Sequence, residues 1–338
     1  MRFLAVVLPL ILLACQTDKT PTEPAGLQRF QLRGETMGTY YSVIYYQTDS
    51  LSNLKPSIDS LLIAVNAEVS NWEENSTVSR FNRSEEGLDV SDAAHFLANY
   101  ELAIGAARAT SEAFDPTIMP LVNYYGFGYG PKEVEGGIDT ARVLELLDQM
   151  GIDKLSMDDD QYLTKTHPQL MLDLGGSAKG YGVDAVSDLL LARGLEIHYV
   201  EIGGEVRARG TKPTGPWTVG VNLPEEGAEF AAIVETLPLV DQAVATSGNY
   251  RNYYEEGGQT FSHTINPQTG FPERNRLLSA SVFAPNCGLA DAYATACMVL
   301  GPEEALQLIE QNEELEAYFL VRAEDGGLEA RTSAGVSL

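Results

Sequence analysis

The chain has 338 residues, of which 44% are hydrophobic, so it can bury the core of one large domain or of two closely packed ones. Its 48 Asp and Glu residues outnumber its 22 Lys and Arg residues, and the formal net charge is −26. Such a surface repels phosphate backbones, so we expect no nucleic-acid partner. Any anionic ligand must be held by a metal, by main-chain N–H groups or by a few well-placed cations.

The N-terminus has the composition of an export signal. Arg2 is followed by the apolar run Leu4–Ala14, which is too short to cross a membrane as a permanent helix. Residues 1–14 are therefore predicted to be a signal peptide. The run ends in Leu-Leu-Ala-Cys15, which resembles a bacterial lipobox, and we expect lipidation of Cys15. The alternative is an ordinary signal peptide with an unrelated cysteine.

The segment that follows Cys15 is predicted to be a tether. Residues 16–26 contain Thr, Pro, Lys and Glu without an apolar period, so residues 15–26 are expected to form the lipidated cysteine and a flexible linker. The folded body is predicted over residues 27–338. A lipid on Cys15 would hold that body at the periplasmic face of a bacterial membrane, and the sequence leaves the choice between inner and outer membrane open.

The first half of the body mixes strands, helices and one long loop. Polar and apolar residues alternate on either side of Gly38, which predicts two strands over Leu27–Tyr46. The segment Phe114–Gly137 is rich in Pro and Gly and has no period, so it is predicted to be a long ordered loop or lid. Apolar spacing and caps predict helices over residues 54–70, 93–109, 139–150 and 177–193, the last ending at Gly194, with short strands between 150 and 174.

The second half is rich in strands. Strands are predicted over residues 197–202, 205–209, 217–221, 233–236, 243–247, 260–265 and 278–284, and a final pair near 317–321 and 328–331. Two helices, over residues 288–300 and 302–312, precede that pair. Strands and helices are segregated rather than alternating regularly, which indicates an α+β fold with mixed or antiparallel sheets and packed helices.

The segment Asp173–Gly180 places a carboxylate at the end of a strand and a pair of glycines at the opening of a helix. Free N–H groups at such a helix start can hold a phosphate. The segment matches neither the Walker loop nor the dinucleotide-binding glycine pattern. Taken alone, it is somewhat more typical of a structural turn with Lys179 in solvent.

A second segment places Asp291 and Thr295 four residues apart, on one face of a helix. Carboxylate and hydroxyl oxygens are ligands that Mg²⁺ prefers. An Asp in the first turn of a helix also stabilises the helix dipole, so this pair alone does not establish a metal site.

A third region contains His263 at the end of a strand, where an imidazole can act as a base or a ligand. Arg251, a few residues earlier, can pair with a carboxylate or a phosphate. The remaining cysteines, Cys287 and Cys297, are predicted to be unpaired and buried, because the second lies in an apolar helical run.

Taken in order, these segments resemble the FAD:protein FMN transferases of the ApbE type. The similarity covers about residues 34–338. The matching blocks are Glu35–Tyr40, Trp72, Ser79–Asn82, Ala113–Thr117, Pro120–Val122, Gly126–Gly128, Asp173–Gly180, Ile202–Arg207, Thr246–Arg251, His263–Gly270, Ala290–Ala292 and Ala294–Ala296.

This resemblance implies a T-fold-like flavin transferase body and a role for each matching residue. The positions implied to hold FAD are Met37, Trp72, Ala113, Phe114, Asp115, Asp173, Lys179 and Ile265. The implied metal ligands are Gly176, Asp291 and Thr295, and the implied catalytic residues are His263 and Asp291. Glu205 stands where many members have Asp, and Asn266 stands where Asp often precedes the Pro. We set both departures aside because neither matches a ligand.

The resemblance also implies an activity: Mg²⁺-dependent transfer of FMN from FAD to a threonine hydroxyl of an acceptor protein, with release of AMP. The expected acceptor is a subunit of a respiratory flavoprotein. One alternative is a Mg²⁺-dependent FAD pyrophosphatase that produces AMP and FMN. Another is a lipoprotein that binds FAD without chemistry.

Overall fold

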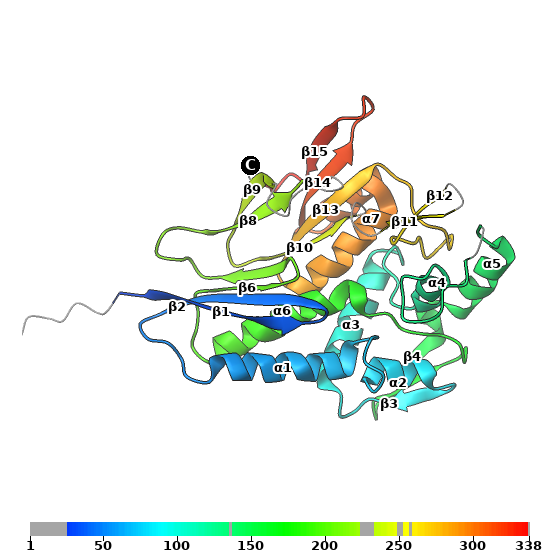
Figure 1. The fold of residues 1–338 in the computed structure, drawn as a ribbon, viewed down its shortest axis with the longest axis horizontal. Coiled ribbons are helices and arrows are strands. Elements are labelled where there is room, and N and C mark those ends of the chain that lie inside the picture. Colours follow the sequence, from blue (N-terminus) through cyan, green and yellow to red (C-terminus); the bar gives the residue numbers. More distant parts are fainter. Residues whose placement is uncertain (1–25, 135–136, 224–232, 249–252, 257–258, 337–338) are drawn as a thin grey trace, which may run out of the picture.

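A computed structural model describes residues 26–134, 137–223, 233–248, 253–256 and 259–336. Its centre is an eight-stranded sheet in which all neighbouring strands are antiparallel (Figure 1). In sheet order the strands are β1 (Gln28–Thr36), β2 (Thr39–Gln47), β6 (His198–Ile202), β7 (Glu205–Arg209), β10 (Ala243–Gly248), β13 (Leu277–Ala284), β14 (Glu316–Arg322) and β15 (Leu328–Thr332).

Smaller sheets and the helices surround this main sheet. The small sheets join β3 (Gly87–Asp89), β5 (Tyr162–Lys165) and β4 (Leu155–Met157); β8 (Trp217–Asn222) and β9 (Ile233–Leu239); and β11 (Tyr253–Glu256) and β12 (Gln259–Ser262). The helices are α1 (Leu54–Val69), α2 (Thr77–Arg83), α3 (Ala94–Ala109), α4 (Met119–Tyr124), α5 (Thr140–Gln149), α6 (Gly175–Ala192) and α7 (Cys287–Glu310). The fold is α+β, as the sequence predicts.

Local signals in the sequence placed most boundaries within one or two residues. Asp139 caps α5 by accepting from the N–H groups of Ala141 and Arg142, and Gly194 follows α6 with a φ of +74°. The two helices predicted over 288–312 are the two halves of α7, which is kinked where Gly301 has a φ of 76° and Pro302 follows. Cys287 and Cys297 are unpaired and buried, as expected.

Three predictions about local structure were wrong in part, and one helix was missed. The segment Phe114–Gly137 is not only a loop, because it contains α4 and contributes Leu121 and Tyr125 to a buried cluster. Helix α6 begins at Gly175, two residues earlier than predicted. The strand expected over 260–265 ends at Ser262. Helix α2 was not predicted, because its seven residues are too few to show a period.

The two faces of the main sheet are covered differently. Helices α6 and α7 pack on one face, called here the helix face, and the β8–β9 hairpin covers the other, the far face (Figure 1). Alternation along β10 follows this division: Ala243 and Ala245 belong to the clusters of the helix face, and Val244 to the cluster of the far face.

Helices α6 and α7 approach each other very closely at one point. A Cβ atom on Gly180 would lie 2.2 Å from the Cys287 carbonyl oxygen, so only glycine fits there. The Asp184 carboxylate then accepts from the N–H groups of Cys287 and Gly288, both at 2.9 Å, and pairs with Arg207 of β7 at 2.6 Å. This buried ion pair and its hydrogen bonds hold the start of α7 against α6 and the main sheet.

A buried histidine at the start of β6 predicts sensitivity to acid. His198 is 0% exposed, its two ring nitrogens contact Ser187 Oγ and the Leu195 carbonyl oxygen, and burial lowers its pKa to about 4 from an ordinary 6.5. Between these two values the unfolded chain binds more protons, so folding stability falls as the pH falls. From pH 7.5 to 4.5 the wild type should lose about 2–3 kcal/mol more of its unfolding free energy than His198→Gln does, as measured by urea titration.

The control for this measurement is His167→Gln, which changes a surface turn and should track the wild type at both pH values. Equal acid sensitivity of the wild type and His198→Gln would contradict the prediction.

Nowhere in the described part of the chain is a helix both long and apolar enough to span a bilayer. Residues 1–25, which include the predicted signal peptide, Cys15 and all of the predicted tether except Gly26, lie outside the described residues.

Candidate active site

One cavity of ≈ 870 Å³ lies where α6, α7 and the end of β10 meet. Ten of the residues singled out from the sequence line it: Ala113, Phe114, Asp115, Asp173, Gly176, Lys179, His263, Ile265, Asp291 and Thr295. Segments that are far apart in the chain therefore meet in one place.

Two predicted FAD-binding residues do not line this cavity. Met37 packs between two core clusters, with its Cε atom 2.9 Å from the Cβ position of Gly182 on α6. Trp72 is 73% exposed. Its neighbour Asn71 donates from Nδ2 to the carboxylate of Asp173, a cavity-lining residue, at 2.9 Å. Trp72 is therefore close to the cavity along the chain but exposed to solvent.

One wall of the cavity contains Asp115 and Asp173 and is called here the Asp173 wall. It is held together by hydrogen bonds between segments that are distant in the sequence. Asp173 Oδ1 accepts from the Gly175 N–H at 2.8 Å, and the Asp173 N–H donates to the Pro116 carbonyl at 2.7 Å. Asp115 is buried and accepts from both the N–H and the hydroxyl of Thr117, each at 2.7 Å. Burial raises the pKa of both carboxyl groups, and these hydrogen bonds oppose that effect.

A second wall contains a cluster of three charges, which we call the charge cluster: Lys179, Glu205 and Asp291. Lys179 Nζ donates to Glu205 Oε1 and lies 3.9 Å from Asp291 Oδ1. Asp291 Oδ2 accepts from the Gly180 N–H at 3.1 Å. Both carboxylates are only 4% exposed, so Lys179 is the cation that makes their burial tolerable.

Burial and mutual attraction compete in this cluster. Burial lowers the pKa of Lys179, but the carboxylates of Asp291 and Glu205 outweigh it, and the net pKa lies above the ordinary value. Burial raises the pKa of Glu205 and of Asp291, and Lys179 opposes this in both. The cluster is therefore sensitive to any change in its charge.

Glu205 is the site residue that sequence reasoning set aside. It begins β7 directly after the Gly203–Gly204 turn and reaches Lys179, and its Oε2 atom is buried without a hydrogen-bond partner among the described residues. An unpaired buried carboxylate oxygen is costly and often marks a functional site. The sequence did contain a signal for Glu205: the position carries an acidic residue both in this chain and in the family that it resembles.

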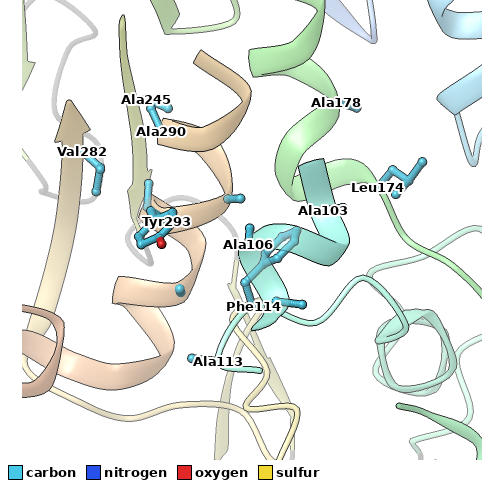
Figure 2. Close-up of a cluster of buried hydrophobic side chains, with 14 of the residues drawn as sticks. Ala103, Ala106, Ala113, Phe114, Leu174, Ala178, Ala245, Val282, Ala290 and Tyr293 are labelled. Atoms are coloured by element: carbon cyan, nitrogen blue, oxygen red, sulfur yellow. The ribbon is translucent and has the colours of Figure 1, made fainter. Parts of the chain in front are cut away.

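The candidate metal wall joins the start of α6 to α7. Asp291 and Thr295 stand one turn apart on α7, and a Cβ atom on Gly176 would lie 3.2 Å from Thr295 Oγ1 and 3.0 Å from the Phe114 ring. Phe114 belongs to the buried cluster that also contains Ala106, drawn in Figure 2. A main-chain carbonyl, a carboxylate and a hydroxyl give an oxygen donor set of the kind that suits Mg²⁺.

Among the described residues, no group of three or more His, Cys, Asp and Glu side chains has the arrangement of a metal site. The donor set proposed here is of mixed type and contains one carboxylate.

His263 also lines the cavity. It follows β12, and its ring is 6.4 Å from that of Phe127, at an angle of 71°. Ile265 is buried beside it. Arg251 lies outside the described residues.

Comparisons with known proteins agree on one family. The model of the ApbE family matches residues 37–319. The FAD:protein FMN transferase of Haemophilus influenzae is 34% identical, over 98% of this chain and 95% of its own length. That of Vibrio cholerae is 35% identical, over 99% and 98% respectively.

Solved structures give the same result. The flavin transferase ApbE from Vibrio cholerae superposes with a TM-score of 0.78 at 33% identity, covering 91% of this chain and 98% of that one. The apo form of the Pseudomonas stutzeri flavinyl transferase ApbE superposes with a TM-score of 0.77 at 31% identity, covering 91% and 96%.

Proposed function

Because this chain belongs to the ApbE family and is an FAD:protein FMN transferase, we propose that its transfer of FMN depends on Mg²⁺ and ends on a threonine hydroxyl of the acceptor. The observation that supports this most directly is the single cavity lined by Asp173, Gly176, Lys179, His263 and Asp291. Candidate nucleotide, metal and proton-transfer groups all line this cavity, which supports the proposal.

The metal would be held by the Gly176 carbonyl, the Asp291 carboxylate and the Thr295 hydroxyl. When bound there, Mg²⁺ would neutralise charge on the pyrophosphate of FAD. This fits a chain with a net charge of −26, whose overall field opposes a dianionic ligand.

The chain's own groups would bind and orient the nucleotide. Lys179 adds a positive charge in the same cavity, beside the leaving phosphate. At the start of α6 the N–H groups of Gly175, Ser177 and Ala178 are bonded to Asp173 Oδ1 and the Leu174 carbonyl, so the Gly176 N–H is the donor that would serve a phosphate oxygen.

In the reaction, the threonine oxygen forms a bond to the FMN-side phosphorus and the bond from that phosphorus to AMP breaks. The hydroxyl proton passes to a base, and AMP leaves with the bridging oxygen. His263 and Asp291 are the two candidate bases. The oxygens of Asp291 already face Lys179 and the Gly180 N–H, which favours His263 as the base.

We also propose that the protein is exported and held through a lipid on Cys15 at the periplasmic face of a bacterial membrane. The lipobox-like end of the apolar N-terminal run and the tether over residues 16–26 support this. A subunit of a respiratory flavoprotein is the proposed acceptor.

The test is incubation of the purified protein with FAD and Mg²⁺, with and without a periplasmic extract as the source of acceptor. We expect AMP release and a fluorescent flavin band that survives a denaturing gel, with the flavin mapped to a threonine by mass spectrometry. Chelation by EDTA should abolish both. AMP and free FMN without a covalent band would instead identify a pyrophosphatase.

A further inference from the structure

One edge of β10 is left open within the main sheet. Strand β13 pairs with all of Ala243–Gly248, but β7 pairs only with Ala243 and Val244. The β6–β7 hairpin turns at Gly203 and Gly204, whose φ values are +63° and +113°, so β7 begins too late to continue the pairing. Beyond Val244, β10 therefore has no neighbouring described strand on this side.

The main-chain groups that face the open edge can be identified from the ladder. The Ala208 N–H donates to the Gln242 carbonyl at 2.9 Å, so the main chain of Gln242 faces β7. In an antiparallel sheet, every second residue faces the same neighbour. The N–H and C=O groups of Thr246 and Gly248 therefore point into the open edge, where they have no partner in the described ranges.

This edge is part of the candidate active site. The cavity is lined by Thr246, Ser247 and Gly248 together with Gly203 and Glu205. These residues lie where β7 stops pairing with β10. An unpaired strand edge is a template for another chain, and most proteins cover or disrupt it. In this protein the open edge of β10 faces the candidate active site.

We propose that the open edge of β10 binds the acceptor polypeptide as an extended strand, which pairs with Thr246 and Gly248 and so carries its threonine into the cavity. This rests on the proposed function, in which the acceptor is a protein. An extended polypeptide presents donors and acceptors with the same two-residue repeat as β10. The phosphates of a nucleotide present only acceptors.

The direction of the side chains supports this assignment. Glu205 reaches Lys179 on α6, and Arg207 reaches Asp184, so both point to the helix face. A strand added beside β10 would likewise direct every second side chain to the helix face, where the charge cluster lies. An acceptor threonine whose side chain points to the helix face would lie near Lys179 and Asp291. The residues directly before and after it in the acceptor would point to the far face.

The test uses the mature protein and a nine-residue peptide centred on the threonine that becomes modified in the flavin-transfer experiment. Thr246→Pro removes the open N–H without removing a hydrogen bond of the sheet, since proline is tolerated at a strand edge. We expect its KM for the peptide to rise at least roughly tenfold, while the Kd for FAD, followed by flavin fluorescence, stays within twofold.

The matched control is Thr246→Val, which keeps the N–H and loses only the hydroxyl contact with Ser281, at 2.8 Å. Because the N–H is retained, its KM for the peptide should stay well below that of Thr246→Pro. An unchanged KM in Thr246→Pro would overturn the proposal. An equal loss of FAD affinity would also overturn it, because the edge would then serve the nucleotide.

A second measurement decides the matter even if Thr246→Pro does not fold. Peptides that are N-methylated at one position each are given to the wild-type protein. We expect kcat/KM to fall at least roughly tenfold at the two positions, two residues apart, that pair with Thr246 and Gly248, and to change little at the others. A uniform effect along the peptide would exclude strand pairing. Absence of any covalent product with the unmodified peptide or the acceptor would instead refute the proposed function itself.

Discussion

Asp291→Asn is expected to lower the rate of FMN transfer by about 10²–10³-fold at saturating FAD while the protein stays folded. The substitution keeps the size of the side chain and an oxygen for the Gly180 N–H, but removes the charge that the proposed Mg²⁺ would meet. It also leaves Lys179 paired with Glu205, so the charge cluster changes from one net negative charge to a balanced pair.

Two measurements accompany the rate. Mn²⁺ binding, followed by electron paramagnetic resonance, should be lost in the variant, and the melting temperature without metal should not fall. The control is Asp188→Asn, an exposed carboxylate on α6, which should behave like the wild type. Normal metal binding and normal activity in Asp291→Asn would remove Asp291 from the site.

Lys179→Met should lower the free energy of unfolding more than Asp291→Asn does. Two carboxylates that are 4% exposed would lose their cation, and breaking such a buried pair costs about 3–5 kcal/mol. Their pKa values are already raised by burial and would rise further without Lys179. A carboxyl group with a raised pKa in the folded state stays protonated there, so the loss should be smaller at pH 5 than at pH 8.

The double variant Lys179→Met/Glu205→Gln separates charge balance from function. It removes one buried negative charge together with the positive one, so most of the lost stability should return. Transfer should stay at least roughly 10²-fold below wild type, because the variant lacks the cation that is proposed to stabilise the leaving phosphate. Unfolding free energies from urea titration, with exposed Lys55→Met as the control, test this. A double variant no more stable than Lys179→Met would contradict the charge-cluster description.

Much of the fold was predictable from local patterns. The alternation around Gly38, the Asp139 cap and the Gly194 stop each depend on residues a few positions apart, and all three match the structure. The pair Asp291 and Thr295 was predictable in the same way, because helical spacing alone puts both on one face of α7.

Other features depend on contacts that no local pattern records. Gly180 and Asp291 are 111 residues apart, yet they share a hydrogen bond because α6 and α7 cross where only glycine fits. Glu205 is a site residue because β7 begins beside α6. Trp72, which matched a family position, is exposed and lies outside the cavity lining.

The sequence by itself determined the elements, the family and most of the chemical groups, since these follow from periodicity, caps and ordered motifs. Only the tertiary structure decided which groups share a cavity, how three charges compensate one another, and that β10 runs past β7 to leave an open edge. The physical reason is that helix and strand propensity act over a few residues, whereas burial, ion pairing and strand pairing depend on the packing of segments more than a hundred residues apart.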